Sequence, residues 1–209
     1  MRVSPALLSL LIAVAPAAAQ APAQMPKAPP GAPDTARIVA GNYAIEPHHT
    51  QVMFALDHLG FSVFRGFFSG VSGTLSLNPA RVTDAKLSVT VPIASIFTTS
   101  PALNKELVEP DWFDAAQFPT ATFVSTKITP GPNNMALIDG NLTLHGQTHP
   151  ATIQARFHGA GKSMMGKGTA IGFDGRLALS RSSYGLGKGV PLVSDHVELT
   201  IAAAFEQQP

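Results

Sequence analysis

Histidine has the widest chemical repertoire of the residue types here, since its ring can bind a metal ion or move a proton near neutral pH. Seven histidines occur among the 209 residues, and no two stand four apart on a predicted helix. His145 and His149 flank a predicted hairpin turn, yet no carboxylate stands at an obvious ligand spacing. We therefore predict no metal and no cofactor, and interpret these histidines as surface or turn residues.

Two glycine-rich segments resemble phosphate-binding motifs without completing them. Residues 160–163 read Ala-Gly-Lys-Ser, but a phosphate loop needs glycine at position 156, which is Arg156, and a helix afterwards. Residues 185–189 read Gly-Leu-Gly-Lys-Gly, and the third glycine of a dinucleotide fingerprint would fall on Val190. We interpret both segments as connections between strands.

Residues for covalent or acid–base catalysis do not form a recognisable motif. The sequence has no G-x-S-x-G elbow and no cysteine, and its acidic residues are scattered. Catalytic residues brought together from distant strands would not be recognised in the sequence. On the residues alone we predict no catalytic residue and no enzymatic activity.

The N-terminal region predicts export. Arg2, an apolar run over 6–15 and Ala17-Ala18-Ala19 form a cleavable secretory signal over 1–19. The run, about ten residues long, is too short to span a bilayer, so we expect no stable membrane insertion. Residues 20–41 are rich in Pro and Ala, which predicts a disordered linker. A periplasmic domain over 42–206 would follow.

The charge balance argues against nucleic acid as a partner. Removal of 1–19 takes away Arg2 and no acidic residue, so the 14 basic and 13 acidic residues become equal in number. Binding to a phosphate backbone requires a basic surface, which this balance does not supply. Hydrophobic residues make up 45% of the chain, and this apolar excess must be buried.

Period-two alternation recurs along the domain and predicts an all-β fold. About eight strands are expected, over 43–58, 67–77, 86–93, 120–128, 135–145, 148–158, 169–181 and 196–205. Residues 59–66 break the alternation and predict a helical turn or loop. The best helix is 100–108, with Ser100 as its cap and Pro101 in its first turn. An antiparallel sandwich or a closed barrel fits, and the barrel is favoured because nearly every strand has one apolar face.

The opening strand carries the clearest apolar face. Val52, Phe54, Leu56 and His58 fall on one side, and the ionisable ring of His58 ends the stripe just before Gly60. This pattern suits a cavity wall with a polar mouth, and equally a packed core with one satisfied histidine. Periodicity does not choose between them.

The apolar faces of the other strands are consistent with one shared lumen. An eight-stranded barrel either fills itself with side chains or holds one small ligand. Ser69, Gly73, Ser125, Gly140 and Gly175 lie at inward positions and would leave space, which favours a cavity. The expected lining includes Phe67, Val71, Leu75, Val89, Val91, Phe123, Leu142, Leu144, Phe157, Phe173, Leu177 and Ile201.

Several motifs, in register over residues 42–205, resemble the YceI-like family of lipocalin-like periplasmic proteins. They are Tyr43-x-Ile45-Glu46-Pro47-x-His49-Thr50-x-Val52-x-Phe54-x-Leu56-x-His58-x-Gly60, Asp111-Trp112-Phe113-Asp114, Phe118-Pro119-Thr120-Ala121, Gly140-x-Leu142-Thr143-Leu144-His145-Gly146 and Ser180-Arg181-x-x-Tyr184-Gly185. The resemblance implies an eight-stranded antiparallel lipocalin-like barrel with one or two short helices near the cavity. It also implies that the chain can form a homodimer.

The resemblance implies a ligand and a site. The ligand would be a polyprenyl chain, an isoprenoid quinone or a fatty-acid-like amphiphile, held without covalent chemistry. His58 and Phe61 would lie at the cavity, Leu107 would face it, and Trp112 and Phe113 would belong to its lid. The helix departs from the usual Arg-Asp-x-His-Leu pattern, and Ser183 replaces the aspartate of Arg-x-Asp-Phe/Tyr-Gly. These losses of charge leave the head group open.

The leading hypothesis is a periplasmic carrier that sequesters one isoprenoid-like chain. The first alternative is an enzyme that acts on a bound lipid in the same cavity, with His58 as general base. The second is an interaction module whose barrel is packed solid.

Overall fold

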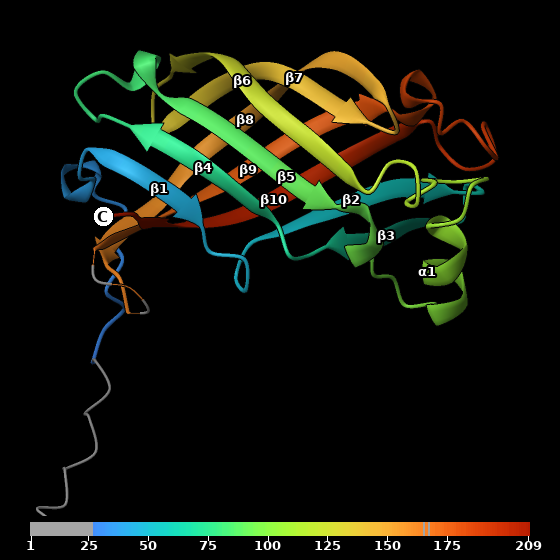
Figure 1. Cartoon of the computed structure of the whole chain (residues 1–209), viewed down its shortest axis with the longest axis horizontal. Helices are drawn as coiled ribbons and strands as arrows, with labels where there is room; N and C mark the ends of the chain where they lie inside the picture. Colours follow the sequence, from blue (N-terminus) through green and yellow to red (C-terminus); the bar gives the residue numbers. More distant parts are fainter. Residues whose placement is uncertain (1–26, 165, 167) are drawn as a thin grey trace, which may run out of the picture.

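The computed structural model describes residues 27–164, 166 and 168–209, so the predicted signal peptide and residues 20–26 lie outside the described residues. Ten strands form one antiparallel sheet that curls into a barrel (Figure 1). The strands are β1 (Gly41–Ile45), β2 (Gln51–His58), β3 (Ser62–Phe68), β4 (Ser72–Leu77), β5 (Lys86–Pro92), β6 (Thr120–Pro130), β7 (Met135–Leu144), β8 (Gln147–Lys162), β9 (Thr169–Ser180) and β10 (His196–Gln207).

The ten strands make a barrel of eight, because two of the eight are interrupted. Both β1 and β2 pair antiparallel with β10: Ile45 lies opposite Phe205 and Gln51 opposite Ala202. In the same way β3 pairs with β2, and β4 pairs with β1. The pairs β1/β2 and β3/β4 are thus each one broken barrel strand. The predicted closed eight-stranded antiparallel barrel is confirmed.

Local chemistry explains both breaks. Between β1 and β2, the carboxylate of Glu46 accepts the backbone N–H groups of His48 and His49, each at 2.9 Å, which turns the chain out of the ladder. Burial raises the pKa of Glu46, but the hydrogen bonds from His48 and His49 outweigh it and hold that pKa below its ordinary value. Between β3 and β4, Gly70 takes a φ of 63°, which glycine adopts without strain.

The helical turn or loop predicted over 59–66 is corrected by the structure, because β3 begins at Ser62. Leu59, Gly60 and Phe61 form the turn of a β2–β3 hairpin, with φ of 60° at Leu59 and 69° at Gly60. The break after β3 also shifts the alternation by one residue. Phe68 therefore faces the interior, and Phe67 points outward against Phe97, with ring centroids 5.1 Å apart.

The β7–β8 hairpin follows the sequence closely. Leu144 pairs with Gln147, so the two-residue turn is His145-Gly146, with φ of 49° and 72°. Positive φ at both positions is the turn geometry that matches the twist of a hairpin. A Cβ on Gly146 would lie 2.7 Å from the edge of the Phe118 ring, so this position requires glycine.

The described part of the predicted linker is structured, which corrects the prediction of disorder there. The Ala32 N–H donates to the carbonyl of Ala160 at 3.0 Å, and the Ala160 N–H donates to that of Ala32 at 2.9 Å. A short 3₁₀ helix follows, η1 (Thr35–Arg37), capped by Asp34. Strand β8 also runs on to Lys162, beyond the predicted end at 158.

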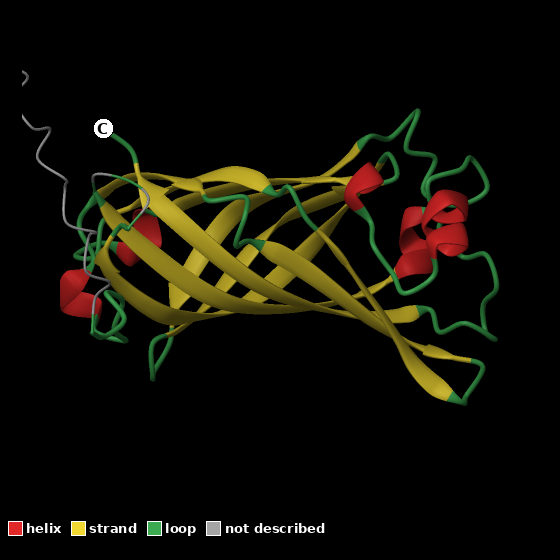
Figure 2. Ribbon diagram, turned by 90° about the horizontal axis from the view of Figure 1, so that it is seen from below, coloured by secondary structure: helices red, strands yellow, loops and turns green. Residues whose placement is uncertain are grey.

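The predicted helix is α1 (Pro101–Leu107), and the Ser100 hydroxyl accepts the Leu103 N–H at 3.3 Å as the predicted cap. Three further 3₁₀ turns are η2 (Val82–Asp84), η3 (Ile93–Ser95) and η4 (Arg181–Tyr184). Helix α1 covers one end of the barrel, whereas η1 and the C-terminus lie at the other (Figures 1 and 2). Within the described residues no helix has the length and hydrophobicity needed to cross a bilayer.

Candidate functional site

The barrel interior holds two cavities that share a boundary. The wide chamber has a volume of about 520 Å³ and the narrow chamber about 250 Å³. Both are lined by Val52, Val91, Leu142 and Leu199, which form a waist between them. The two chambers therefore adjoin inside the barrel, on either side of this waist.

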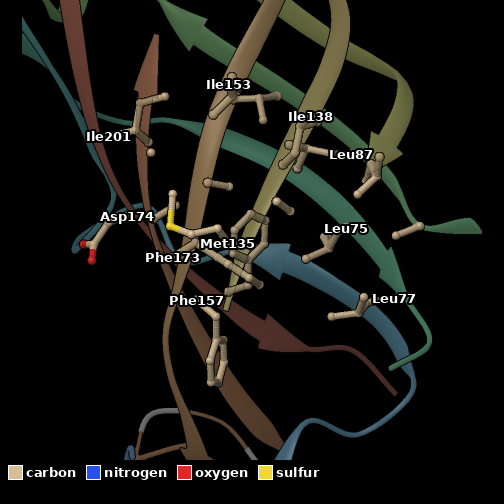
Figure 3. Close-up of a pocket in the computed structure, with 18 of the residues that line it drawn as sticks. Leu75, Leu77, Leu87, Met135, Ile138, Ile153, Phe157, Phe173, Asp174 and Ile201 are labelled. Carbon is tan, nitrogen blue, oxygen red and sulfur yellow. The ribbon is translucent and has the colours of Figure 1, made fainter. Parts of the chain in front are cut away.

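The wide chamber is walled by inward-facing side chains of the strands. Aliphatic residues and the rings of Phe157 and Phe173 converge on the empty space (Figure 3). Polar groups lie at the rim, where Thr35, Asn133 and Asn134 contribute. The carboxylate of Asp174 points away and pairs outside with His158 at 3.1 Å. The chamber can bind apolar material but offers little to a charged group.

The narrow chamber is walled partly by strands and partly by α1 and loops. Phe54, Phe64 and Phe68 form an aromatic cluster, with ring centroids 6.5 Å (Phe54–Phe64) and 5.9 Å (Phe54–Phe68) apart. Phe113 meets Phe68 edge-on at 6.0 Å. Leu103 and Leu107 of α1 complete this side. Beside this aromatic wall lie the ionisable groups of the lumen.

Arg181 is the buried charge of the narrow chamber, with 7% of its surface exposed. Its Nε donates to the carbonyl of Ser194 at 2.9 Å and Nη2 to that of Val193 at 2.8 Å. Nη1 donates to the carbonyls of Leu186 and Lys188. The guanidinium thus holds the β9–β10 loop, residues 185–195, against the barrel end.

The electrostatics of Arg181 fit this role. Burial lowers the pKa of Arg181, and the negative charge of Asp195 partly offsets the effect. The Asp195 carboxylate accepts the Ser182 N–H at 2.7 Å and its hydroxyl at 2.8 Å, and these two bonds lower the pKa of Asp195. Because arginine keeps its charge at neutral pH, the chamber carries a permanent positive group at one end.

His58 and Trp112 form the rest of the polar rim. The His58 ring lies 6.2 Å from the Phe64 ring, and within the described residues it makes no hydrogen bond to a carboxylate. A general base normally has a group that orients it, and His58 has none there. Trp112 donates its indole N–H to Glu106 at 2.9 Å, and Lys188 lies 4.9 Å from the centre of its ring.

Most of the predicted lining residues line one of the two chambers. In the wide chamber are Val71, Leu75, Val89, Phe123, Phe157, Phe173, Leu177 and Ile201. In the narrow chamber are Phe54, Leu56, His58, Leu107, Trp112, Phe113 and Leu144. Val52, Val91 and Leu142 belong to both.

Two predicted lining residues lie outside the lumen. Phe61 is 89% exposed at the tip of the β2–β3 hairpin, because that hairpin projects beyond the barrel end. Phe67 points outward because the break at Gly70 reverses the alternation on β3. Phe68 takes the inward place that the sequence assigned to Phe67.

The inward glycines do not leave empty space as predicted. A Cβ on Gly140 would lie 2.4 Å from the Phe123 ring, and one on Gly66 would lie 2.4 Å from the Phe54 ring. Each glycine thus seats a phenylalanine from the adjacent strand, an arrangement known as aromatic rescue. At Gly175 the side chains of Ile153 and Ile201 take the room. At these positions a neighbouring side chain occupies the space beside the glycine, and Gly175 also lines the wide chamber.

Sequence reasoning missed several lining residues on regular strands, among them Leu87, Ile138 and Ile153, and others whose omission has a structural reason. Phe64 and Phe68 were lost with the register of β3. Ile38 contributes to the wide chamber from the region predicted to be disordered. Arg181 could have been found, since it is a lone cation in a strand-to-loop motif, but only the structure shows that its side chain turns inward.

The hairpin histidines contact backbone carbonyl groups. His145 Nδ1 donates to the carbonyl of Tyr184 at 3.0 Å, and His149 Nε2 donates to that of Ser183 at 2.9 Å. Both therefore fasten η4 to the β7–β8 hairpin. Across the described residues, no group of three or more His, Asp or Glu side chains is arranged to hold a metal ion.

A small closed antiparallel barrel with an apolar lumen is the architecture of proteins that enclose one small ligand. Residues 43–205 match the YceI-like domain, and the chain belongs to the YceI family. A UPF0312 protein of Pseudomonas fluorescens is 36% identical over 173 residues, which cover 79% of this chain and 87% of the relative. A UPF0312 protein of Vibrio cholerae is 34% identical, over 70% of this chain and 78% of the relative.

Solved structures share the fold. Burkholderia cenocepacia BcnA is 25% identical with a TM-score of 0.69, covering 77% of this chain and 98% of that protein. The Campylobacter jejuni YceI protein is 29% identical with a TM-score of 0.64, covering 73% and 90%. A polyisoprenoid binding domain from Saccharophagus degradans, 14% identical with a TM-score of 0.60, covers 79% and 98% and shows the fold alone.

Proposed function

We propose that this protein is a periplasmic carrier that sequesters one long-chain isoprenoid, or a similar amphiphilic lipid, without covalent chemistry. The two adjoining apolar chambers, which share the residues of the waist, carry this proposal. The related fold of a polyisoprenoid binding domain is consistent with it. A polyprenyl chain, an isoprenoid quinone and a fatty-acid derivative all have the required shape.

The dimensions of the lumen suit a linear tail. A 12-residue strand such as β9, tilted as in other eight-stranded barrels, spans about 30 Å along the axis. Burial of each CH₂ group contributes about 0.8 kcal/mol. The tail would therefore supply most of the affinity, against the cost of ordering a flexible chain.

The head group would lie at the narrow end. Arg181, His58 and Trp112 line that chamber, and a guanidinium has five N–H groups, of which the loop carbonyls engage four. One Nη2 N–H is left to bind a ligand carbonyl or hydroxyl. A ligand with its head at this end would extend its tail through the waist into the wide chamber.

The two alternatives receive less support. A packed interaction module would not contain cavities of about 520 and 250 Å³. An enzyme with His58 as base would need a carboxylate to orient the ring, and the described residues place none in hydrogen-bonding contact with it.

Native mass spectrometry of protein purified without extraction tests the proposal. We expect a bound lipid mass in the wild type and its loss in Leu142→Asp, because a carboxylate at the waist opposes an apolar tail. Val124→Asp is the matched control: Val124 lies on the neighbouring strand and is 49% exposed on the outer surface. The control should keep the lipid.

Other outcomes would contradict the carrier. An identical bound mass in the wild type and in Leu142→Asp would show that the lipid does not occupy the waist. A lipid-free wild type that takes up no apolar dye would favour a packed module. Turnover of the bound lipid that disappears in His58→Ala would favour an enzyme. Fractionation of producing cells tests the periplasmic location.

A further inference from the structure

An exposed apolar tip projects from the barrel at the end that carries the narrow chamber. We define the docking tip as residues 59–64 of the β2–β3 hairpin and 189–194 of the β9–β10 loop. The exposed fractions are 44% at Leu59, 89% at Phe61, 49% at Val63, 40% at Val190 and 67% at Leu192. Water therefore surrounds several large apolar side chains in one place.

The two segments of the docking tip are held together by their backbones. The Leu59 N–H donates to the carbonyl of Leu192 at 2.8 Å, and His58 forms a β-bridge with Val193. The Ser194 N–H donates to the carbonyl of Asp57 at 2.9 Å. The tip is thus one structural unit that presents its apolar side chains as a defined surface.

The docking tip meets the conditions for entering a lipid phase. No residue in either segment has an ionisable side chain. Several of its backbone donors are paired: the Phe61 N–H donates to the carbonyl of His58 at 3.2 Å, and the Gly60 N–H to the Asp57 carboxylate at 2.8 Å. The Val193 N–H donates to the carbonyl of Gly189 at 2.9 Å. Hydrocarbon accepts backbone groups only when they are paired in this way.

The docking tip is continuous with the chamber. Phe64 and Val193 belong to the tip and also line the narrow chamber, next to His58. Trp112, a residue type enriched at the boundary between membrane and water, lines the same chamber. Lys188 beside it pairs with Asp111 at 3.1 Å, so the rim carries balanced charge at this point.

We infer that the docking tip binds the surface of a lipid bilayer, with Phe61 and Leu192 entering the acyl region. A protein partner of unspecified shape has no comparable support, whereas the uncharged tip and its paired backbone match lipid directly. Docking would place the narrow chamber at the membrane surface, where a lipid ligand can pass between bilayer and lumen. The passage of a ligand between bilayer and lumen rests on the proposed function, whereas the docking itself does not.

Vesicle flotation tests the docking. Wild-type protein should float with phosphatidylcholine vesicles, and the double variant Phe61→Ser/Leu192→Ser should bind at least roughly tenfold more weakly, since two large apolar side chains no longer leave water. Leu137→Ser is the control, because Leu137 is 47% exposed on β7, away from the tip. It should float like the wild type. High salt should not release the protein, because the tip has no charge to screen.

Three results would overturn the inference. The first is a wild type that does not float, and the second is equal flotation of the double variant. The third is a dimer that the double variant converts to monomer while vesicle binding persists, which would make the tip an interface between two copies. Native mass spectrometry separates the two proposals: a lipid-free wild type contradicts the carrier, whereas the flotation result depends only on the tip.

Discussion

The wide and narrow chambers differ in what builds their walls. Around the wide chamber the side wall is a continuous hydrogen-bonded ladder, from β4 through β10 and closed by β1, whereas η1, η2 and the β6–β7 turn line its outer end. Around the narrow chamber, strands supply one part, and α1, the Trp112-Phe113 segment and the β9–β10 loop supply the rest. The side wall of the wide chamber cannot open without breaking the barrel, whereas much of the wall of the narrow chamber can open by moving segments that the ladder does not hold.

This difference assigns separate tasks to the two ends. A ladder-built wall fixes depth and width, which would select the tail of a ligand. A wall of loops allows entry and exit, because local opening costs least where few ladder bonds must break. The segments of the narrow end are held by individual side chains, and each can be removed to test this distinction.

The largest effect is expected for Arg181→Ala. The change leaves the carbonyls of Leu186, Lys188, Val193 and Ser194 without their partner in a buried region. The free energy of unfolding should fall by about 3 kcal/mol or more. Urea unfolding gives the loss, and hydrogen exchange should show residues 185–195 opening first.

The conservative variant sharpens this result. Arg181→Lys places a single ammonium where a planar fork reaches four carbonyls, so it should recover only part of the stability. Full recovery would mean that charge alone, and not the fork geometry, holds the loop.

The wide chamber should respond to Gly140→Ala. Its Cβ would lie 2.4 Å from the Phe123 ring and 2.5 Å from the carbonyl oxygen of Val124, so both the ring and the backbone of the neighbouring strand must shift. Overpacking of this kind costs about 1–3 kcal/mol. In contrast with Arg181→Ala, hydrogen exchange should rise throughout the ladder and not in one loop.

Gly172→Ala is the control for this position. The nearest atom to its Cβ would be 3.7 Å away, which is an ordinary contact. A loss of stability equal to that of Gly140→Ala would show that any glycine on these strands is needed, and that seating Phe123 is not the reason.

Ser100→Ala tests the helix that covers the narrow chamber. It removes the acceptor for the Leu103 N–H, and the loss of an N-cap costs about 1 kcal/mol. Thermal unfolding measures the loss, and lipid should leave the variant faster because α1 lines the chamber. Ser100→Thr keeps the cap and should match the wild type, so an equal defect there would point to another role for the site.

The smallest effect is expected on the free energy of unfolding when the pH is lowered. The Ser182 N–H and hydroxyl, and more weakly Arg181, lower the pKa of Asp195, so the folded state binds this proton less tightly than the unfolded chain. The stabilisation is complete above the unfolded pKa of about 3.9 and is lost as the pH falls through the folded value. Because the carboxylate is partly exposed, we expect less than about 1 kcal/mol.

Urea unfolding of wild type and Asp195→Asn, at neutral pH and near pH 3, isolates this contribution. The difference in the free energy of unfolding between the two proteins should be present at neutral pH and shrink in acid. A difference that does not change with pH would exclude the ionised carboxylate as its source.

The sequence predicted the ladder better than the ends of the barrel. Alternation located Phe123, Phe157 and Leu177 on the lumen because each lies on an unbroken strand. It failed at Phe67, because the break at Gly70 shifts the inside/outside alternation by one residue. Periodicity alone does not detect such a shift. At Phe61 the family resemblance placed the side chain at the cavity, but the hairpin extends beyond the barrel end and the ring is exposed.

The ends escaped prediction because their contacts are distant in sequence. Ala32 forms a β-bridge with Ala160, and no pattern in a stretch rich in Pro and Ala predicts that pairing. Arg181 turns inward because the carbonyls of residues 186–194 surround it, which depends on how the loop closes. The glycines were misinterpreted because the groups beside them come from other strands: the Phe123 ring at Gly140, and the side chains of Ile153 and Ile201 at Gly175.

The position of the chain ends has a practical consequence. Thr35 and Ile38 line the wide chamber, and the Gln208 N–H donates to the carbonyl of Asn42, so both ends of the described domain lie away from the docking tip (Figure 1). A purification tag or a surface linker attached at Pro209 would therefore leave the narrow end unobstructed. Molecules immobilised in this way would present the hairpin outward, an orientation suited to sensors for ligands delivered from solution.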